Sequence, residues 1–412
     1  MLMFLLSLGV LLLVARMVGE LARHLRQPEV LGELLAGLLL GPTIFGLIAP
    51  EAQAALFPRS GDGAKVFAGF SQLAVVLFLF IVGLEIELGQ VRKNGRRSLC
   101  VGFLGMVIPA ALGFAIAWWW PSLVDGGGGL HSGPLPFALF FAIAMAVSAL
   151  PVIARTLTDL GQLQSDVGVV VISAAILSDL VGWIAFAAVL GMTGGSTGHA
   201  LPAGWAATSA VLFAVLMLTA VRWGLVGLLP LINARWSWPG GILGFCLGLA
   251  LLAGALTEWL GLHAIFGAFL AGAALAGNPH LRERTREVLN QFIGFFFAPL
   301  FFASIGLRVD LRNDLDVGLT AVVLAIACLG KLVGGTLGAR LGGMSPRESW
   351  AVGVALNSRG VMEIILGTLA LEAGLIGKPL FVALVVTALA TSLFASPMLL
   401  KLIGRGPAVL RN

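Results

Sequence analysis

Four charged residues lie deep inside long apolar stretches of this chain: Asp179, Lys331, Arg359 and Glu363. Ionisable side chains at such depth mark ion or proton pathways by default, because placing charge in an apolar environment is costly. Asp179 is the clearest candidate. A carboxylate there must be neutralised either by a proton or by a dehydrated monovalent cation. That mutual exclusion is a physical basis for exchange, and a permanently protonated, hydrogen-bonded acid is the structural alternative.

The other three charges have two interpretations each. Lys331 could form an ion pair with Asp179 that breaks when a cation arrives, or it could be a purely structural counter-ion. Arg359 and Glu363 are four residues apart, so they share one side of a helix. We expect them to neutralise each other and to steady the helix that carries them.

Small polar side chains gather at two interruptions of the apolar pattern. Pro151 removes a backbone donor within the apolar stretch 135–157. A polar break that ends at Gly360 interrupts the stretch 349–374. Ordinary proline kinking and polar packing are the alternatives to functional breaks. The residues that could offer neutral oxygens to a cation are Ser148, Ser178, Asn357 and Ser358.

The composition indicates whether the surface of this chain faces water or lipid. Of 412 residues, 59% are apolar and only 11% are charged, whereas soluble domains carry about 25% charge. Much of the surface must therefore face lipid. No phosphate-binding glycine motif, nucleophile elbow, zinc spacing or basic stretch suited to nucleic acid is present. We expect no enzyme activity, no cofactor, no nucleic-acid partner, and no metal other than a transported monovalent cation at Asp179.

The apolar stretches predict an all-α polytopic membrane protein. A membrane helix needs roughly 20 mostly apolar residues, and long continuous stretches favour helices over an alternating β-barrel pattern. About thirteen spans are expected, at residues 2–21, 29–48, 66–87, 97–119, 135–157, 166–190, 204–224, 240–259, 262–277, 288–306, 317–341, 349–374 and 379–403.

Orientation follows from the distribution of Lys and Arg. The connections after odd-numbered spans, with the C-terminus, hold 18 of these residues, and those after even-numbered spans hold five. Positive residues accumulate on the cytoplasmic side. The pattern predicts an outside N-terminus and a cytoplasmic C-terminus in the cell membrane, such as a bacterial inner membrane. The short tail predicts no cytoplasmic regulatory domain and leaves such a role to a separate subunit.

The chain also contains an internal repeat. Residues 32–37 (GELLAG) match 267–272 (GAFLAG), and residues 83–88 (GLEIEL) match 306–311 (GLRVDL). Each pair is seven spans apart, and an odd offset inverts the second copy relative to the first. The two interrupted spans are separated by the same offset. Inverted repeats with paired broken helices are typical of secondary transporters.

Several of these segments resemble the cation:proton antiporter superfamily, in particular its monovalent cation:proton antiporter-2 branch. That branch includes glutathione-gated potassium efflux antiporters and plant cation/proton exchangers. The likeness covers essentially the whole chain. The resemblance rests on the segments FLFIVGLE at 78–85, SALPVIAR at 148–155, Ser178-Asp179, Gly330-Lys331, and NSRG at 357–360 with Glu363.

The resemblance implies a division of labour between two sets of spans. Spans one to four fall within residues 1–118. A dimerisation unit would comprise residues 1–90 and 240–306, and a mobile core would comprise 97–119, 135–190 and 317–404. Residues 204–224 would link them. The core would carry two crossed broken helices and move as an elevator in a homodimer embedded in lipid.

The same resemblance implies roles for individual residues. Asp179 matches the family's ion-carrying carboxylate, and Lys331 matches its core lysine. One departure matters: electrogenic sodium/proton members carry two adjacent aspartates here, whereas this chain has Ser178 before Asp179. A one-for-one, electroneutral exchange is therefore the simpler expectation.

Exchange of K⁺ or Na⁺ for protons is the leading functional hypothesis. An ion-coupled symporter of organic solutes on the same scaffold is the main alternative. A cation channel and a membrane sensor that transports nothing are the others. Ion selectivity depends on small changes in oxygen placement, so the sequence does not choose between K⁺ and Na⁺.

Overall fold

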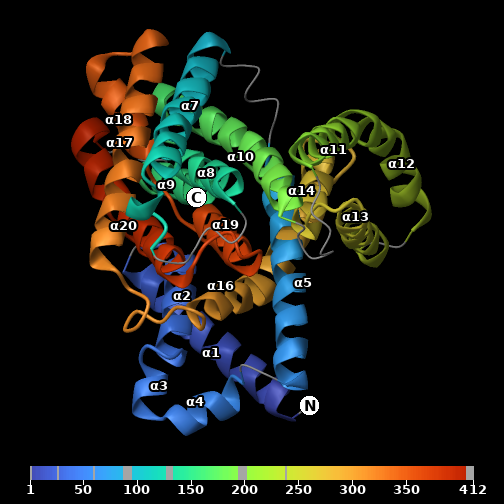
Figure 1. Ribbon diagram of the computed structural model, residues 1–412. Helices are drawn as coiled ribbons and strands as arrows, with labels where there is room; N and C mark the ends of the chain where they lie inside the picture. The colour runs from blue at the N-terminus through green and yellow to red at the C-terminus, as the bar shows by residue number, and fades with distance from the viewer. Residues whose placement is uncertain are drawn as a thin grey trace. The chain divides into compact units, whose positions relative to one another are not determined.

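The fold is entirely helical in the part of the chain that the computed structural model describes, which comprises residues 2–25, 27–58, 61–86, 95–126, 133–193, 202–236 and 239–404 (Figure 1). No β-strand occurs among these residues. The all-α prediction is therefore confirmed.

Eleven helices in the described residues are long and apolar enough to cross a membrane. Two shorter apolar helices, α8 (Pro134–Ala146) and α14 (Ala264–Leu275), lie in the fifth and ninth expected spans. These helices confirm an integral membrane protein but do not confirm a count of thirteen spans. The predicted span 204–224 is longer than expected, because helix continues through to Arg235 with Pro230 inside it.

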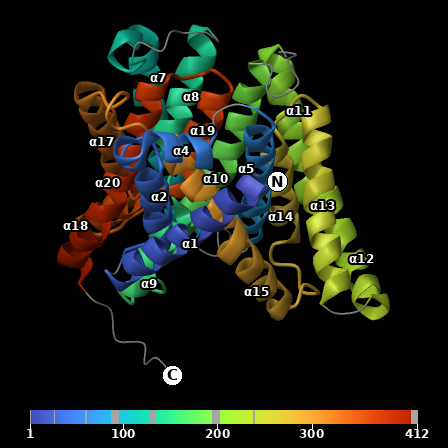
Figure 2. The same ribbon diagram turned by 90° about the horizontal axis from the view of Figure 1, so that it is seen from below.

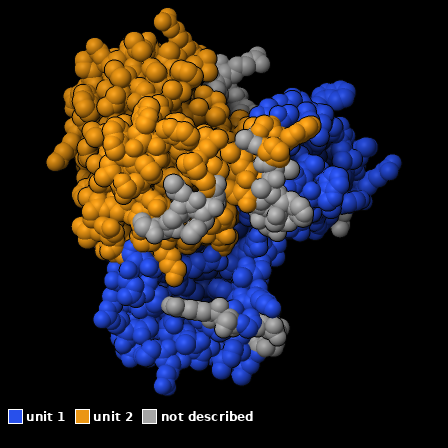
Figure 3. Space-filling model, viewed as in Figure 1, with its two compact units in different colours: residues 1–86, 208–314 blue, residues 87–207, 315–412 orange. Residues whose placement is uncertain are grey.

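The chain divides into two compact units, coloured separately in Figure 3. Unit 1 contains residues Met1–Ile86 and Thr208–Asp314. Its helices are α1 (Leu2–His24), α2 (Glu29–Leu40), α3 (Phe45–Ile48), α4 (Pro50–Leu56), α5 (Asp62–Leu84), the π-helix η3 (Met217–Val221), α12 (Arg222–Arg235), α13 (Gly240–Trp259), α14, α15 (Glu283–Phe292), the π-helix η4 (Ile293–Phe297) and α16 (Ala298–Gly306).

Unit 2 contains residues Glu87–Ala207 and Leu315–Asn412. Helix α11 (Ala203–Leu216) contains the boundary between the units. The helices of unit 2 are α7 (Gly95–Trp119), the short η1 (Pro121–Leu123), α8, α9 (Leu150–Asp159), α10 (Asp166–Met192), α17 (Val317–Leu341), α18 (Pro346–Leu356), α19 (Val361–Glu372) and α20 (Lys378–Ile403).

Glycines repeat the same packing in the two halves of unit 1. A Cβ atom added to Gly37 would lie 2.0 Å from the carbonyl oxygen of Ala303, three residues before Gly306. A Cβ on Gly272 would lie 2.0 Å from that of Phe80, three residues before Gly83. The matched sequence strings pair Gly37 with Gly272 and Gly83 with Gly306. The internal repeat is therefore present in the helix contacts, α2 with α16 and α14 with α5.

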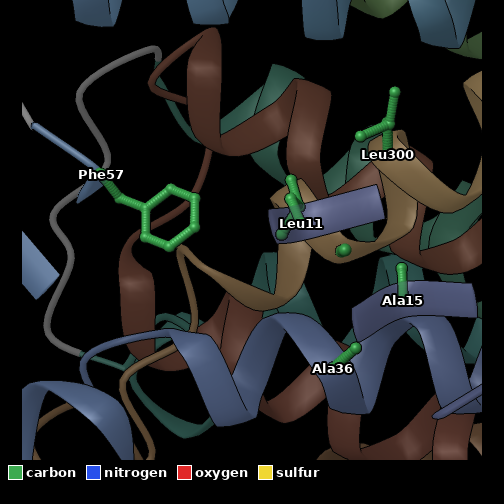
Figure 4. Close-up of a cluster of buried hydrophobic side chains, with 6 residues drawn as sticks. Leu11, Ala15, Ala36, Phe57 and Leu300 are labelled. Atoms are coloured by element: carbon green, nitrogen blue, oxygen red, sulfur yellow. The ribbon is translucent and has the colours of Figure 1, made fainter. Parts of the chain in front are cut away.

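A buried apolar cluster holds α1, α2 and α16 of unit 1 together (Figure 4). Small alanines alternate with larger side chains there, which allows helix backbones to approach closely. Leu8, Leu12 and other half-buried residues pack around the cluster. Its members are Leu11, Ala15, Ala36, Phe57, Leu300 and Ala303.

A glycine stripe joins α17 to α7 in unit 2. The two helices lie side by side in Figures 1 and 2 and are in contact. A Cβ on Gly330 would lie 2.8 Å from Pro109, and one on Gly334 would lie 2.6 Å from the carbonyl oxygen of Leu104. Lys331 lies next to this stripe on α17 and is buried within the unit, with 1% of its surface exposed.

Two helices of unit 2 are interrupted where the sequence predicts. Helix α8 ends at Ala146 and α9 begins at Leu150, with extended backbone at Val147 and Ala149. Pro151 falls in the first turn of α9, where its missing N–H leaves no hydrogen bond unmade. Helix α18 ends at Leu356 and α19 begins at Val361.

Candidate functional site

The two interruptions meet inside unit 2. The backbone N–H of Ala149 donates to the carbonyl oxygen of Ser358 at 3.1 Å. The Ser148 hydroxyl donates to the carbonyl oxygen of Leu356 at 2.9 Å. Gly360 allows this approach, since a Cβ there would lie 2.9 Å from a methyl group of Val152. In both bonds the first break supplies the donor and the second break supplies the acceptor.

Cationic side chains satisfy the carbonyl end of α8. The last carbonyls of a helix lack partners within the helix and carry partial negative charge. Arg359 donates to the carbonyl oxygens of Ala144 at 2.7 Å and Met145 at 2.6 Å. Lys331 Nζ donates to Ala146, whose carbonyl oxygen also accepts from the Ser178 hydroxyl at 3.1 Å. Two of the residues predicted to balance charge at the site, Lys331 and Arg359, therefore meet at the carbonyl end of α8.

Arg359 also ties α19 to its neighbours. Its guanidinium forms an ion pair with Glu363 at 3.0 Å, one helical turn away, and both side chains are buried. Its backbone N–H donates to the Thr391 hydroxyl at 3.3 Å, and its carbonyl oxygen accepts from Ser392 on α20. The sequence predicts no role for either of these α20 residues. Hydroxyl groups on an apolar helix give no signal that distinguishes such a role from ordinary packing.

Asp179 is fully buried on α10, and neither of its carboxylate oxygens has a hydrogen-bond partner among the described residues. It forms no ion pair with Lys331, whose ammonium group donates to Ala146 instead. The neighbouring Ser178 contacts the first break through that same carbonyl. A buried carboxylate without protein partners needs a proton or an ion from outside the fold to satisfy it.

Two further predicted oxygens also lack partners. The side-chain oxygen of Asn357 and the hydroxyl of Ser358 are buried without a hydrogen bond, and both belong to the second break. Ser148 and Ser178 differ, because each donates its hydroxyl hydrogen to a backbone carbonyl. Among the described residues, no group of three or more His, Cys, Asp or Glu side chains could hold a metal ion.

A buried charge in unit 1 escaped the sequence prediction. Glu33 on α2 is 3% exposed, with one oxygen 3.9 Å from Arg16 and the other without a partner. Its counterpart in the repeat is Ala268, and that of Arg16 is Leu251. The packing of the repeat therefore does not require the charges. Their position near a span end, beside Glu29 and Arg23, made them resemble solvated interfacial residues.

The fold and this site define a class of helical membrane proteins in which two broken helices pack against the helix that carries a buried carboxylate. The family model for the transmembrane sodium/hydrogen exchanger matches residues 9–403. The chain belongs to this family, as its resemblance to cation:proton antiporters predicts.

Curated relatives match nearly the whole chain. It is 30% identical to K(+)/H(+) antiporter 1 of Saccharomyces cerevisiae over 96% of its own length and 46% of that protein. It is 29% identical to Na(+)/H(+) antiporter NhaS4 of Synechocystis over 97% of both chains. The chain spans about half the length of the yeast relative and of the similar Arabidopsis thaliana cation/H(+) antiporter 17.

A solved structure shares the fold. The sodium proton antiporter MjNhaP1 from Methanocaldococcus jannaschii superposes with a TM-score of 0.65 at 15% identity, covering 98% of this chain and 99% of that one. The described helices thus share the fold of that antiporter.

Proposed function

We propose that this protein exchanges K⁺ or Na⁺ for protons by alternating access, with cation and proton competing for Asp179. The observation that carries the proposal is the fully buried carboxylate with two unpartnered oxygens beside two joined helix breaks. Antiporters of both K⁺ and Na⁺ among the relatives support the same function. The relatives therefore leave open which of the two cations is carried.

Competition follows from the chemistry of a single carboxylate. In a low-dielectric environment an unpaired charge is strongly unfavourable, so Asp179 is stable when it is protonated or when it binds a cation. Lys331 and Arg359 are already engaged with carbonyl oxygens of α8. Lys331 attracts Asp179 without bonding to it, so the transported species supplies the direct partner of the carboxylate. One carboxylate then carries one positive charge in either direction.

The supporting residues have separate roles in this proposal. Asn357 and Ser358 supply neutral oxygens to the cation. Ser148 joins the two breaks, and Ser178 ties α10 to the first of them. Arg359, with Glu363 as its counter-ion, and Lys331 fix the carbonyl end of α8. Unit 2, which contains all of these residues, would be the moving body. Unit 1 would form the homodimer contact, with the N-terminus outside and the C-terminus in the cytoplasm.

The decisive test is reconstitution of the purified protein in proteoliposomes that contain a pH-sensitive dye. When Na⁺ or K⁺ is added outside, the wild-type protein should exchange it for luminal protons, and the dye should report a rise in the luminal pH. Asp179→Asn should reduce exchange to the level of empty liposomes, because the amide can bind neither a proton nor a cation as the carboxylate does.

Asp166→Asn is the matched control. Asp166 begins the same helix, its side chain is 80% exposed, and it lies 3.7 Å from Arg97. This variant should exchange like the wild type. Monodisperse, thermally stable Asp179→Asn protein that still exchanges cations for protons would contradict the proposal. Proton-coupled uptake of an organic solute would favour the symporter instead.

A further inference from the structure

A cysteine contacts the side chain of Asn357 at the second helix break. Asn357 is the residue that follows α18, and its amide Nδ2 donates to the Sγ atom of Cys328 at 3.3 Å. Cys328 lies on α17, three residues before Lys331, and is partly exposed. A thiol sulfur is a weak hydrogen-bond acceptor. The contact therefore orients the amide without binding it tightly.

This contact determines what the other end of the amide can do. The carboxamide group is planar, so fixing Nδ2 also fixes the direction of Oδ1. That oxygen is buried and has no hydrogen-bond partner. The next residue, Ser358, is 1% exposed, and its hydroxyl oxygen is likewise unpartnered. Buried acceptors without donors are unfavourable unless something satisfies them. A dehydrated monovalent cation does so with neutral oxygens.

We propose that Cys328 is a positioning residue for cation binding: it holds the amide of Asn357 so that Oδ1 is presented to the transported K⁺ or Na⁺. The inference rests on the proposed function and deepens it, by separating a residue that sets cation affinity from the carboxylate that binds both cation and proton. Cys328 itself contacts no transported ion. Its effect is confined to the cation half of the cycle, because a proton on Asp179 needs no oxygen from Asn357.

The test measures initial rates of exchange in proteoliposomes over a range of cation concentrations. Cys328→Ala removes the acceptor and frees the amide to rotate. The apparent KM for the cation should rise roughly twofold to fivefold, the lower end of the range for one hydrogen bond, because the thiol is a weak acceptor. The maximal rate and the pH dependence of the rate at saturating cation should stay unchanged. Cys328→Ser keeps an acceptor and should restore the wild-type KM.

Two controls separate positioning from packing. Cys246→Ala shortens a buried cysteine on α13 of unit 1 and should leave the KM unchanged. Asn357→Ala should raise the KM by itself, and adding Cys328→Ala to it should have no further effect, because the positioned group is gone. An additive double variant would contradict the inference.

The failures of the two proposals are distinguishable. If Cys328→Ala and Cys328→Ser both keep the wild-type KM while Asp179→Asn is inactive, the positioning role is wrong and the exchange mechanism stands. If Asp179→Asn retains exchange, the proposed function itself is wrong. If Cys328→Ala misfolds, Cys328→Val decides, because valine fills the space of the thiol without offering an acceptor: a raised KM with an unchanged pH profile supports positioning, and an unaltered KM overturns it.

Discussion

Arg359 connects four helices of unit 2 through one side chain and its backbone. The guanidinium reaches carbonyl oxygens on α8 and, at 3.4 Å, that of Ala327 on α17, while the backbone contacts Thr391 on α20. Planar guanidinium groups are suited to several simultaneous acceptors. Arg359 therefore replaces, at a helix end deep in the unit, the solvent that caps helices at a protein surface.

Replacing Arg359 with Met should destabilise unit 2 strongly. The change leaves Glu363 as a buried charge without a partner and exposes the α8 carbonyls to an apolar environment, for which a loss of about 3–5 kcal/mol is typical. Thermal unfolding of the detergent-purified protein measures the effect. Arg340→Met is the control, because Arg340 is an exposed residue on α17. Equal melting temperatures for the two variants would contradict this role.

At the scale of helices, the glycine contacts of unit 1 determine how closely α5 and α14 approach. A Cβ on Gly83 would lie 2.0 Å from the carbonyl oxygen of Phe269, a distance that no side chain tolerates. The repeat places the equivalent contact at Gly306, whose Cβ would lie 2.3 Å from the carbonyl oxygen of Leu34. The close approach of the paired helices therefore requires that Gly83 and Gly306 have no Cβ atom.

Gly83→Ala should separate α5 from α14 and lower the free energy of unfolding by about 1–3 kcal/mol, as overpacked cores do. Gly69→Ala makes the same chemical change on the same helix, where no atom lies within 4 Å of the added Cβ. It should leave stability unchanged or slightly higher, since alanine favours helix. Thermal unfolding of both variants tests the contact, and equal stabilities would count against it.

The sequence could predict apolar lengths and their interruptions, because both depend on local residue types. It placed the breaks near Pro151 and Gly360, where they occur. It could not predict that Lys331 bonds to Ala146 rather than to Asp179, since backbone carbonyls exist at every position and only the fold selects one. The predicted span 204–224 also stops short of the helix, which continues through Pro230 to Arg235.

At the scale of the whole molecule, the site predicts the charge moved in each cycle. A carboxylate that carries either one proton or one monovalent cation transfers equal charge in both directions. The equilibrium distribution of cation should therefore be independent of membrane potential. If one net charge moved per cycle, 100 mV would contribute about 2.3 kcal/mol, equivalent to roughly a 50-fold change in the cation ratio.

Exchange in proteoliposomes at clamped potentials of opposite sign measures this dependence. Equal rates and equal final gradients at both potentials would support one-for-one exchange. A shift of the final gradient with potential would show that a second group, such as Lys331, also gives up a proton during the cycle. The same preparation without protein gives the passive permeability to be subtracted.

The two unpartnered oxygens of Asp179 also have a consequence for leakage. A transporter wastes a gradient whenever its site crosses the membrane with nothing bound. Here that bare state would carry a full negative charge that accepts no hydrogen bond from the described residues, at a cost of several kcal/mol that attraction to Lys331 offsets only in part. Each 1.4 kcal/mol slows such a crossing by about tenfold. Hydrogen bonds from the protein to Asp179 would stabilise the bare state and so permit slippage. In the proposed mechanism, their absence would therefore tighten the coupling between the two ion flows.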